Sequence, residues 1–194
     1  MAKFIKAHKF VERAEGGYTD NPNDNGNWTG GKKGSGDLIG TNYGISAPVL
    51  KAYLGRTPSV ADMKNLQKST AEKIYKKNYW DANNLGLIQN DSIALLIYDG
   101  AVNQGSYAMK DSVAKAFVSI GKSGVTTNNA LTKGGVQRIN KTAPKRLFEA
   151  IKDQREARYK RSSSAKYFLK GWLKRLNSID FQTGVFWKDH WGKI

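Results

Sequence analysis

The sequence contains no cysteine, four prolines and two histidines, and it has half as many acidic as basic residues. The absence of cysteine excludes a disulfide framework, a zinc–thiolate site and a thiol nucleophile. His8 and His190 are too few and too far apart in the sequence to indicate a metal site. No apolar run approaches the roughly 20 residues of a transmembrane helix. We therefore expect a protein without a membrane span, a metal or another cofactor.

The charge of the chain is strongly positive, because 32 Lys and Arg outnumber 16 Asp and Glu and give a formal net charge of +16 over 194 residues. Hydrophobic residues make up 39% of the chain and aromatic residues 11%, which excludes a disordered basic tail. The charge favours polyanionic surroundings such as nucleic acid, an anionic cell envelope or acidic lipid. Residues 1–8 lack the apolar stretch and the cleavage site of a signal peptide, so we expect none.

The first part of the chain combines one helix with a loop-rich segment. Apolar residues within 4–14 recur at spacings of three and four, which predicts an amphipathic helix. The pair Gly16-Gly17 ends it, because adjacent glycines are poor helix formers. Residues 16–40 are rich in Gly, Asn, Asp, Lys and Thr, and turn signals such as Asn25-Gly26 favour hairpins or a small irregular sheet.

Three short helices are expected next. A helix over 46–54 is bounded by a capping serine and by Gly55, and Ser59 can cap a second helix with Asp62 at its third position. Residues 69–72, Ser-Thr-Ala-Glu, form the pattern of a capping box that opens a third helix.

From Asp91 onward the apolar spacing predicts helix almost throughout, with a long helix starting at Pro144 and a last one marked by residues 168–176. The composition changes near residue 90. We therefore expect an α+β fold, predominantly helical, with a small irregular sheet in its N-terminal third. Its two lobes, residues 1–90 and residues 91–194, should pack as one compact body.

Glu15 and Asp24 are the strongest candidates for chemistry. A glycosidase needs a carboxylic acid with a raised pKa to protonate the leaving oxygen, and a second group to activate water or to stabilise the cation-like transition state. A glutamate just past a helix end, beside two glycines, has a backbone that leaves space for a ligand. Asp24 follows after eight intervening residues, in an Asn/Gly-rich turn that keeps a carboxylate hydrated.

These residues belong to longer motifs, Glu15-Gly16-Gly17-Tyr18, then residues 21–26 (Asn-Pro-Asn-Asp-Asn-Gly) and residues 41–45 (Thr-Asn-Tyr-Gly-Ile). Together they resemble the N-terminal motif of glycoside hydrolase family 108, the muramidase-type phage endolysins and their bacterial relatives. Residues 91–176 resemble the helical peptidoglycan-binding region that follows in that family. The resemblance implies a lysozyme-like fold with a catalytic lobe at 1–90 and a peptidoglycan-binding lobe at 91–194.

The resemblance also implies roles: Glu15 is the general acid, and Asp24 and Thr41 position water or stabilise the cation. One feature departs from the pattern. In related phage lysozymes the threonine follows the aspartate more closely, whereas here sixteen residues separate Asp24 from Thr41, as if residues 28–38 were inserted. Thr29 lies nearer the expected spacing but lacks the Asn-Tyr-Gly-Ile that follows Thr41, so Thr41 is preferred and Thr29 stays a competitor.

Several further residues are candidates for binding the sugar strand. Aromatic rings stack on sugars and amides bind acetamido groups, although aromatic residues at helical spacing are more often part of a core. The candidates are Tyr43, Tyr79, Trp80, Asn103 and Gln104.

The sequence thus predicts a muramidase that hydrolyses the β-1,4 bond between N-acetylmuramic acid and N-acetylglucosamine in peptidoglycan. A lytic transglycosylase acting on the same bond and a non-catalytic basic protein that binds the envelope or nucleic acid are the alternatives. No helix-turn-helix accompanies the basic residues near the C-terminus, so no specific nucleic acid is expected. We expect a monomer. The resemblance further implies a protein that is made in a host cytoplasm and reaches the wall through a membrane lesion formed by a holin-type partner.

Overall fold

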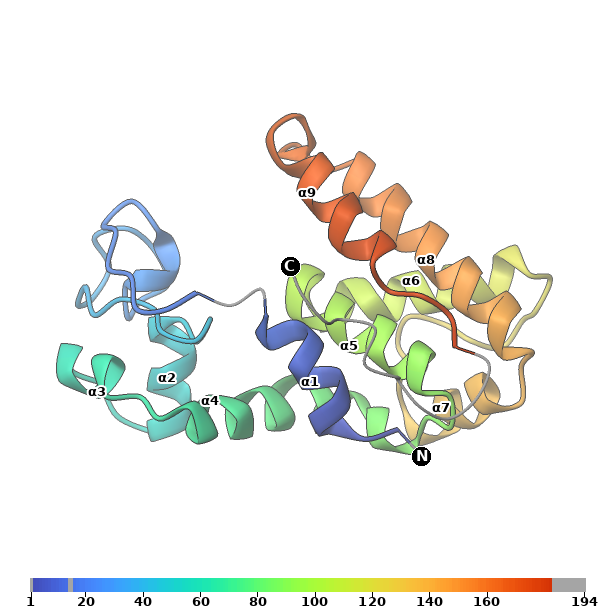
Figure 1. Ribbon diagram of the computed structural model, residues 1–194, viewed down its shortest axis with the longest axis horizontal. Coiled ribbons are helices and arrows are strands. Elements are labelled where there is room, and N and C mark those ends of the chain that lie inside the picture. Colours follow the sequence, from blue (N-terminus) through green and yellow to red (C-terminus); the bar gives the residue numbers. More distant parts are fainter. Residues whose placement is uncertain (1, 14–15, 183–194) are drawn as a thin grey trace, which may run out of the picture. The chain divides into compact units, whose positions relative to one another are not determined.

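The computed structural model describes residues 2–13 and 16–182 (Figure 1). The chain divides into two compact units. Among the described residues, one unit, here the N-terminal unit, lies within 8–78, and the other, here the helical unit, comprises residues 2–7 together with residues 79–182. The division therefore falls after Asn78, whereas the sequence suggested a change near residue 90. The assignment of a catalytic and a peptidoglycan-binding lobe stays a prediction.

The N-terminal unit contains most of helix α1 (Phe4–Glu12), and then α2 (Ala47–Leu54), α3 (Val60–Lys64) and α4 (Lys68–Tyr75). Gly55 ends α2 with a positive φ of 68°, as its sequence position predicts. The cap of α3 is also confirmed: the Ser59 hydroxyl accepts a bond from the Asp62 amide, and the Asp62 carboxylate accepts one from the Ser59 amide.

The capping box expected at residues 69–72 is wrong. The N-cap residue of α4 is Gln67, two residues before the expected Ser69, and the first backbone bonds run from the amides of Thr70 and Ala71 to the carbonyl of Gln67. Ser69 therefore lies inside the first turn, and Glu72 is available to line a pocket described below.

The small sheet expected from the turn signals of residues 16–40 is not seen among the described residues, and residues 19–45 make three isolated antiparallel bridges instead. These join Thr19 to Thr41, Trp28 to Leu38 and Asn42 to Ile45. Glycines with positive φ occur at positions 31, 34, 36, 40 and 44, and such conformations interrupt an extended ladder. A short 3₁₀ turn, η1 (Asn25–Asn27), completes this loop region.

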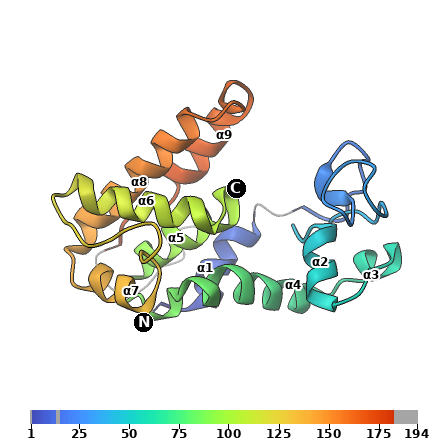
Figure 2. The same cartoon turned by 180° about the vertical axis from the view of Figure 1, so that it is seen from behind.

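The helical unit is built around α5 (Asp91–Gln104), in which every residue from Ser92 to Ala101 is buried. Helix α8 (Pro144–Lys160) packs against α5, α6 (Ser106–Ser119) and α9 (Ala165–Asn177), and Figure 2 shows this group from behind. The remaining elements are α7 (Lys133–Asn140), the π-helical turn η2 (Lys76–Trp80), η3 (Asp81–Asn83) and η4 (Leu85–Leu87). The start of α8 at Pro144 agrees with the sequence prediction.

No helix in the part of the chain that the structure describes is long and apolar enough to cross a membrane.

A buried charge cluster fixes the centre of this unit. Asp99 and Arg155, both fully buried, form an ion pair at 2.7 Å, and Arg175 reaches the other Asp99 oxygen at 2.8 Å. Arg155 also donates to the Leu96 carbonyl and to the Tyr159 hydroxyl. Because a buried charge is tolerated only when it is paired and hydrogen-bonded, this cluster ties α5, α8 and α9 into one arrangement.

Candidate active site

Asp24 and Thr41 lie together around Gly26. The Gly26 amide donates to Asp24 Oδ1 at 2.8 Å, and the Thr41 hydroxyl donates to the Gly26 carbonyl at 3.4 Å. A Cβ atom added to Gly26 would lie 3.3 Å from Asp24 Oδ1 and 3.8 Å from Thr41 Oγ1, which places both polar groups beside the same backbone position. Asp24 is exposed and Thr41 is half-buried, so both are accessible to solvent.

The backbone around Thr41 is held on both sides. Thr19 and Thr41 exchange two backbone hydrogen bonds of 2.8 and 2.9 Å. After Thr41 the chain turns through Tyr43 and Gly44, which have φ values of 48° and 69°, the positive values that a type I′ turn requires. The buried side chain of Asn42 fixes this turn, because its Nδ2 atom donates to the Met63 carbonyl near the end of α3.

The inserted segment closes on itself. The carbonyl of Asn27 accepts bonds from the amides of both Ile39 and Gly40, at 3.0 and 3.1 Å, and the Trp28–Leu38 bridge follows directly. The two ends of this segment are therefore hydrogen-bonded to each other, and the backbone at Gly40 lies next to the backbone at Asn27. This closure brings Thr41 next to Gly26 in spite of the sixteen residues between Asp24 and Thr41.

Thr29, the competing threonine, has a different place. It is only 4% exposed, and its hydroxyl accepts a bond from the Asp37 amide at 2.9 Å within the insertion. The added Cβ at Gly36 would lie 2.3 Å from Thr29 Oγ1, so the hydroxyl is enclosed by the loop itself. The geometry favours Thr41 over Thr29 as the partner of Asp24.

Beside this loop region, the N-terminal unit contains a pocket of about 170 Å³. Its walls come from α1, from α4 and from the loops that begin at Gly16 and pass through Tyr43. The lining residues are His8, Glu12, Gly16, Gly17, Tyr43, Lys68, Ala71, Glu72 and Tyr75. Tyr75 supports the rim, because its hydroxyl donates to the Tyr43 carbonyl at 3.3 Å and its ring lies 5.1 Å from the His8 ring.

Two carboxylates, one lysine and one histidine meet in this pocket. Burial lowers the pKa of His8, and Lys68 acts in the same direction, while the nearby carboxylates of Glu12 and Glu72 oppose that shift. Lys68 forms an ion pair with Glu12, and this hydrogen bond raises the pKa of the lysine. One atom each of His8, Glu12 and Glu72 lies within 4.8 Å of the others, a set that could hold a divalent cation. The Lys68 ammonium already supplies a countercharge there, so the geometry does not require one.

No motif in the sequence marks Glu12, Glu72 or His8 as pocket residues. His8 and Glu12 stand four residues apart on one helix, and this spacing alone places them on the same face of α1. Glu72 comes from α4, and no local pattern indicates which helix that residue faces.

Glu15, the predicted general acid, lies outside the described residues. The two glycines that follow it in the sequence, Gly16 and Gly17, line the pocket and are exposed. A Cβ added to either glycine would meet nothing within 4 Å, so the backbone at these two positions is open.

The predicted sugar-stacking residues divide between the two units. Tyr43 is 37% exposed and lines the pocket in the N-terminal unit. Tyr79 and Trp80 belong to the helical unit. Trp80 is only 3% exposed, and its ring meets those of Phe4 and Tyr98 edge to face at 5.8 and 5.5 Å. The prediction of a stacking platform at Trp80 is therefore wrong, because neighbouring rings cover it in the core.

The two predicted amide contacts, Asn103 and Gln104, bond inside the helical unit. Asn103 Nδ2 donates to the Asp99 carbonyl and to Asp99 Oδ1, and Gln104 Nε2 donates to the Arg155 carbonyl. Both amide nitrogens thus support the buried charge cluster, a role that the sequence did not reveal. Their contact with a sugar strand stays a prediction.

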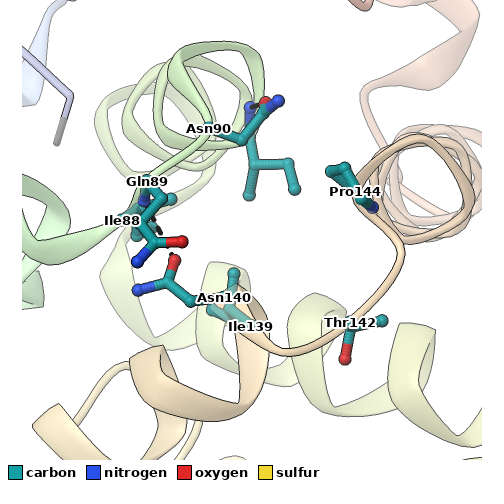
Figure 3. Close-up of a pocket in the computed structure, with 8 residues that line it drawn as sticks. Ile88, Gln89, Asn90, Ile139, Asn140, Thr142 and Pro144 are labelled. Carbon is teal, nitrogen blue, oxygen red and sulfur yellow. Dashed lines mark hydrogen bonds between the residues drawn. The ribbon is translucent and has the colours of Figure 1, made fainter. Parts of the chain in front are cut away.

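A second cavity, of about 230 Å³, lies in the helical unit between the start of α5 and the end of α7 (Figure 3). Asn140 spans its edge by accepting from the Gln89 amide and donating to the Leu87 carbonyl, both at 2.9 Å. The Asn90 side chain caps α5. None of the described residues that line this cavity carries an ionisable side chain. The lining residues are Ile88, Gln89, Asn90, Ile93, Ile139, Asn140, Thr142 and Pro144.

Comparison with known proteins identifies one family. The family model described as glycosyl hydrolase 108 matches residues 8–105, just over half of the chain, and this segment includes Glu15, Asp24 and Thr41. The structure of SagA from Brucella abortus is similar, with 28% sequence identity and a TM-score of 0.68 over 91% of this chain and 90% of that one. A search of curated proteins finds no match.

Proposed function

The chain belongs to the glycosyl hydrolase 108 family, and from this premise we propose that it is a muramidase that cleaves the β-1,4 bond between N-acetylmuramic acid and N-acetylglucosamine. Family membership makes it a glycoside hydrolase and supports peptidoglycan as its substrate. Its predominantly helical structure fits a lysozyme-like fold.

The observation that carries the proposal is the meeting of Asp24 and Thr41 at Gly26. One Asp24 oxygen is held by the Gly26 amide, and no described residue bonds to the other. The Thr41 hydroxyl bonds to the Gly26 carbonyl only at long range, and its oxygen keeps its acceptor capacity. A water molecule bridging these two oxygens would be oriented by both, which is the task that inverting hydrolysis assigns to the second group.

In the proposed mechanism Glu15 protonates the glycosidic oxygen as the bond breaks, and Asp24 and Thr41 orient the water that attacks the sugar carbon. The support for Glu15 is its position in the family motif, directly before the glycines that line the pocket. Tyr43, exposed at the rim of that pocket, is the residue we propose for contact with the sugar strand.

The replacement Glu15→Gln tests this mechanism, because the amide keeps the shape of the side chain but has no proton to give. The rate of hydrolysis of purified peptidoglycan should fall by about 10²-fold or more, the usual contribution of acid–base catalysis. Asp37→Asn, which neutralises an exposed carboxylate in the same unit, is the matched control and should keep the wild-type rate.

Mass spectrometry of the released fragments tests the chemistry separately. Hydrolysis adds water and leaves reducing muramic acid ends, whereas a transglycosylase leaves anhydromuramic ends. Anhydro products from the wild-type protein would contradict hydrolysis, and a Glu15→Gln variant that works at the wild-type rate would contradict the assignment of the acid.

The remaining family-derived expectations are proposals of the same kind. We propose that the helical unit binds peptidoglycan, that the protein acts on the cell wall as a monomer, and that its net charge of +16 attracts it to the anionic envelope. The phage origin and the holin-type release implied by the resemblance stay predictions.

A further inference from the structure

The hairpin formed by the end of α8 and by α9 carries charges of one sign. Residues 157–179 contain seven Lys and Arg and no Asp or Glu. In both views of the molecule the turn between the two helices extends beyond the other helices of this unit (Figures 1 and 2). A cationic element therefore stands at the outer end of the unit.

The inner face of α9 is fixed by contacts with the rest of the unit. Leu176 is fully buried, and the Trp172 ring stacks on the Tyr159 ring with centroids 5.1 Å apart and planes at 24°. Arg175 bonds to Asp99 in the buried charge cluster. These contacts determine which side chains of α9 face outward.

The outer face combines aromatic and basic side chains. Tyr167 is 72% exposed and stands beside Lys166, whereas Phe168 is 56% exposed and lies on the side of Trp172, with the two ring centroids 5.8 Å apart. Both rings are near the start of the helix, at the outer end of the hairpin. Lys166, Lys170 and Lys174 follow at four-residue spacing and are all exposed. Such a spacing places the three ammonium groups in one row, where like charges repel each other.

Within the described part of the protein, Lys166, Lys170 and Lys174 form no ion pair. The carboxylates that form ion pairs near the hairpin do so with other basic residues. Glu156 pairs with Lys160, Asp111 with Lys115 and Arg158, and Asp99 with Arg155 and Arg175. An exposed row of repelling charges beside two exposed rings is an arrangement that an anionic partner would stabilise.

We propose that the outer face of α9 docks the protein on an anionic phospholipid surface. The lysines would lie among the phosphate groups, and Tyr167 and Phe168 would enter the boundary between headgroups and acyl chains, as in other basic amphipathic helices. This interaction goes beyond glycan hydrolysis, because it places the enzyme at a membrane next to the wall.

The geometry of the two rings favours lipid over a sugar or nucleic-acid strand. Their planes meet at 62° with centroids 6.1 Å apart, so they do not form one flat platform on which successive rings of a polymer could stack. The lysine beside them, Lys166, lies 4.7 Å from the Tyr167 ring centre, which sets charge and aromatic surface side by side as a membrane interface requires.

Sedimentation with vesicles tests the proposal on the full-length chain. Vesicles of phosphatidylglycerol mixed with phosphatidylcholine should bind the protein, and vesicles of phosphatidylcholine alone should bind it far less. The triple variant Lys166→Gln, Lys170→Gln, Lys174→Gln should lower the partition coefficient roughly a hundredfold at low salt, at about fivefold for each charge. The double variant Tyr167→Ser, Phe168→Ser should lower it about tenfold, since each ring moves part of its apolar surface out of water.

The matched control removes three exposed lysines elsewhere in the same unit, in the variant Lys133→Gln, Lys141→Gln, Lys145→Gln. Circular dichroism melting confirms that all variants are folded. An equal loss of vesicle binding in the control would overturn the proposal, because the effect would then come from net charge alone. Unchanged vesicle binding of the α9 variants, with reduced binding to lipid-free peptidoglycan sacculi or to DNA, would overturn it in favour of those partners.

Discussion

The exchange of each threonine for valine separates the two candidates for the third catalytic group. Valine has nearly the shape of threonine but lacks the hydroxyl, so the substitution removes one polar group and little else. The structure predicts opposite outcomes at the two positions: Thr41→Val should impair hydrolysis with little change in stability, and Thr29→Val should impair stability with little change in hydrolysis.

The magnitudes follow from the contacts of each hydroxyl. Thr29 Oγ1 is buried and accepts the Asp37 amide at 2.9 Å, so its loss leaves a donor without its partner and should cost about 1–3 kcal/mol in the free energy of unfolding. The Thr41 hydroxyl makes one long bond, at 3.4 Å, to the Gly26 carbonyl, and its loss should cost less than about 1 kcal/mol. If this hydroxyl orients the attacking water, the rate should fall by about 10²-fold, near the lower end of the usual contribution of acid–base groups.

Two measurements on each variant suffice: urea unfolding followed by circular dichroism, and the initial rate of reducing-end release from purified peptidoglycan. The rate should be measured well below the unfolding temperature of the less stable variant, so that loss of folded protein does not imitate loss of catalysis. A full rate for Thr41→Val together with a severe loss for folded Thr29→Val would refute the assignment and show that the inserted segment carries the catalytic threonine.

Two further predictions concern stability. Asp99→Asn removes the charge that compensates the buried Arg155, so the free energy of unfolding should fall by about 3–5 kcal/mol, whereas Asp111→Asn, at a partly exposed pair, should cost less than about 1 kcal/mol in the same urea titration. Burial holds the pKa of His8 in the folded protein below 6.5. The free energy of unfolding should therefore be highest above pH 6.5 and should decline as the pH falls through 6.5 towards the folded-state pKa. Urea titrations across this range should show a smaller decline for His8→Gln, and an identical decline would contradict the role given to His8.

Helices were the part of the fold that local sequence predicted best. Gly55, Ser59 with Asp62, and Pro144 mark helix ends through interactions with their own neighbours, and the structure confirms them. The expected cap at Ser69 is wrong because α4 starts two residues earlier, with Gln67 as its N-cap, and a pattern match does not weigh the competing start. The small sheet failed for a related reason, since turn signals indicate reversals of the chain but not how long the paired strands become.

Long-range packing decided what the sequence left open at the site. Trp80 is a residue type that often stacks on sugars, but the rings of Phe4 and Tyr98, which are distant in sequence, cover it. The same holds for Gln104, whose side-chain amide donates to the carbonyl of Arg155 on another helix. Glu72 joins the pocket through the packing of α4 near α1, which no local periodicity predicts.

The closure of residues 28–38 shows how two groups can lie close in space although many residues separate them in the sequence. A catalytic pair requires two groups close in space, and the number of residues between them matters only through the path of the chain. Here the Asn27 carbonyl receives the amides of Ile39 and Gly40, so the insertion leaves and returns at almost the same point. The positive φ of Gly40, 87°, allows the return, and a Cβ there would lie 2.6 Å from the Thr19 carbonyl oxygen. If the closed segment, residues 28–38, is left out of the count, Thr41 follows Asp24 closely in the sequence.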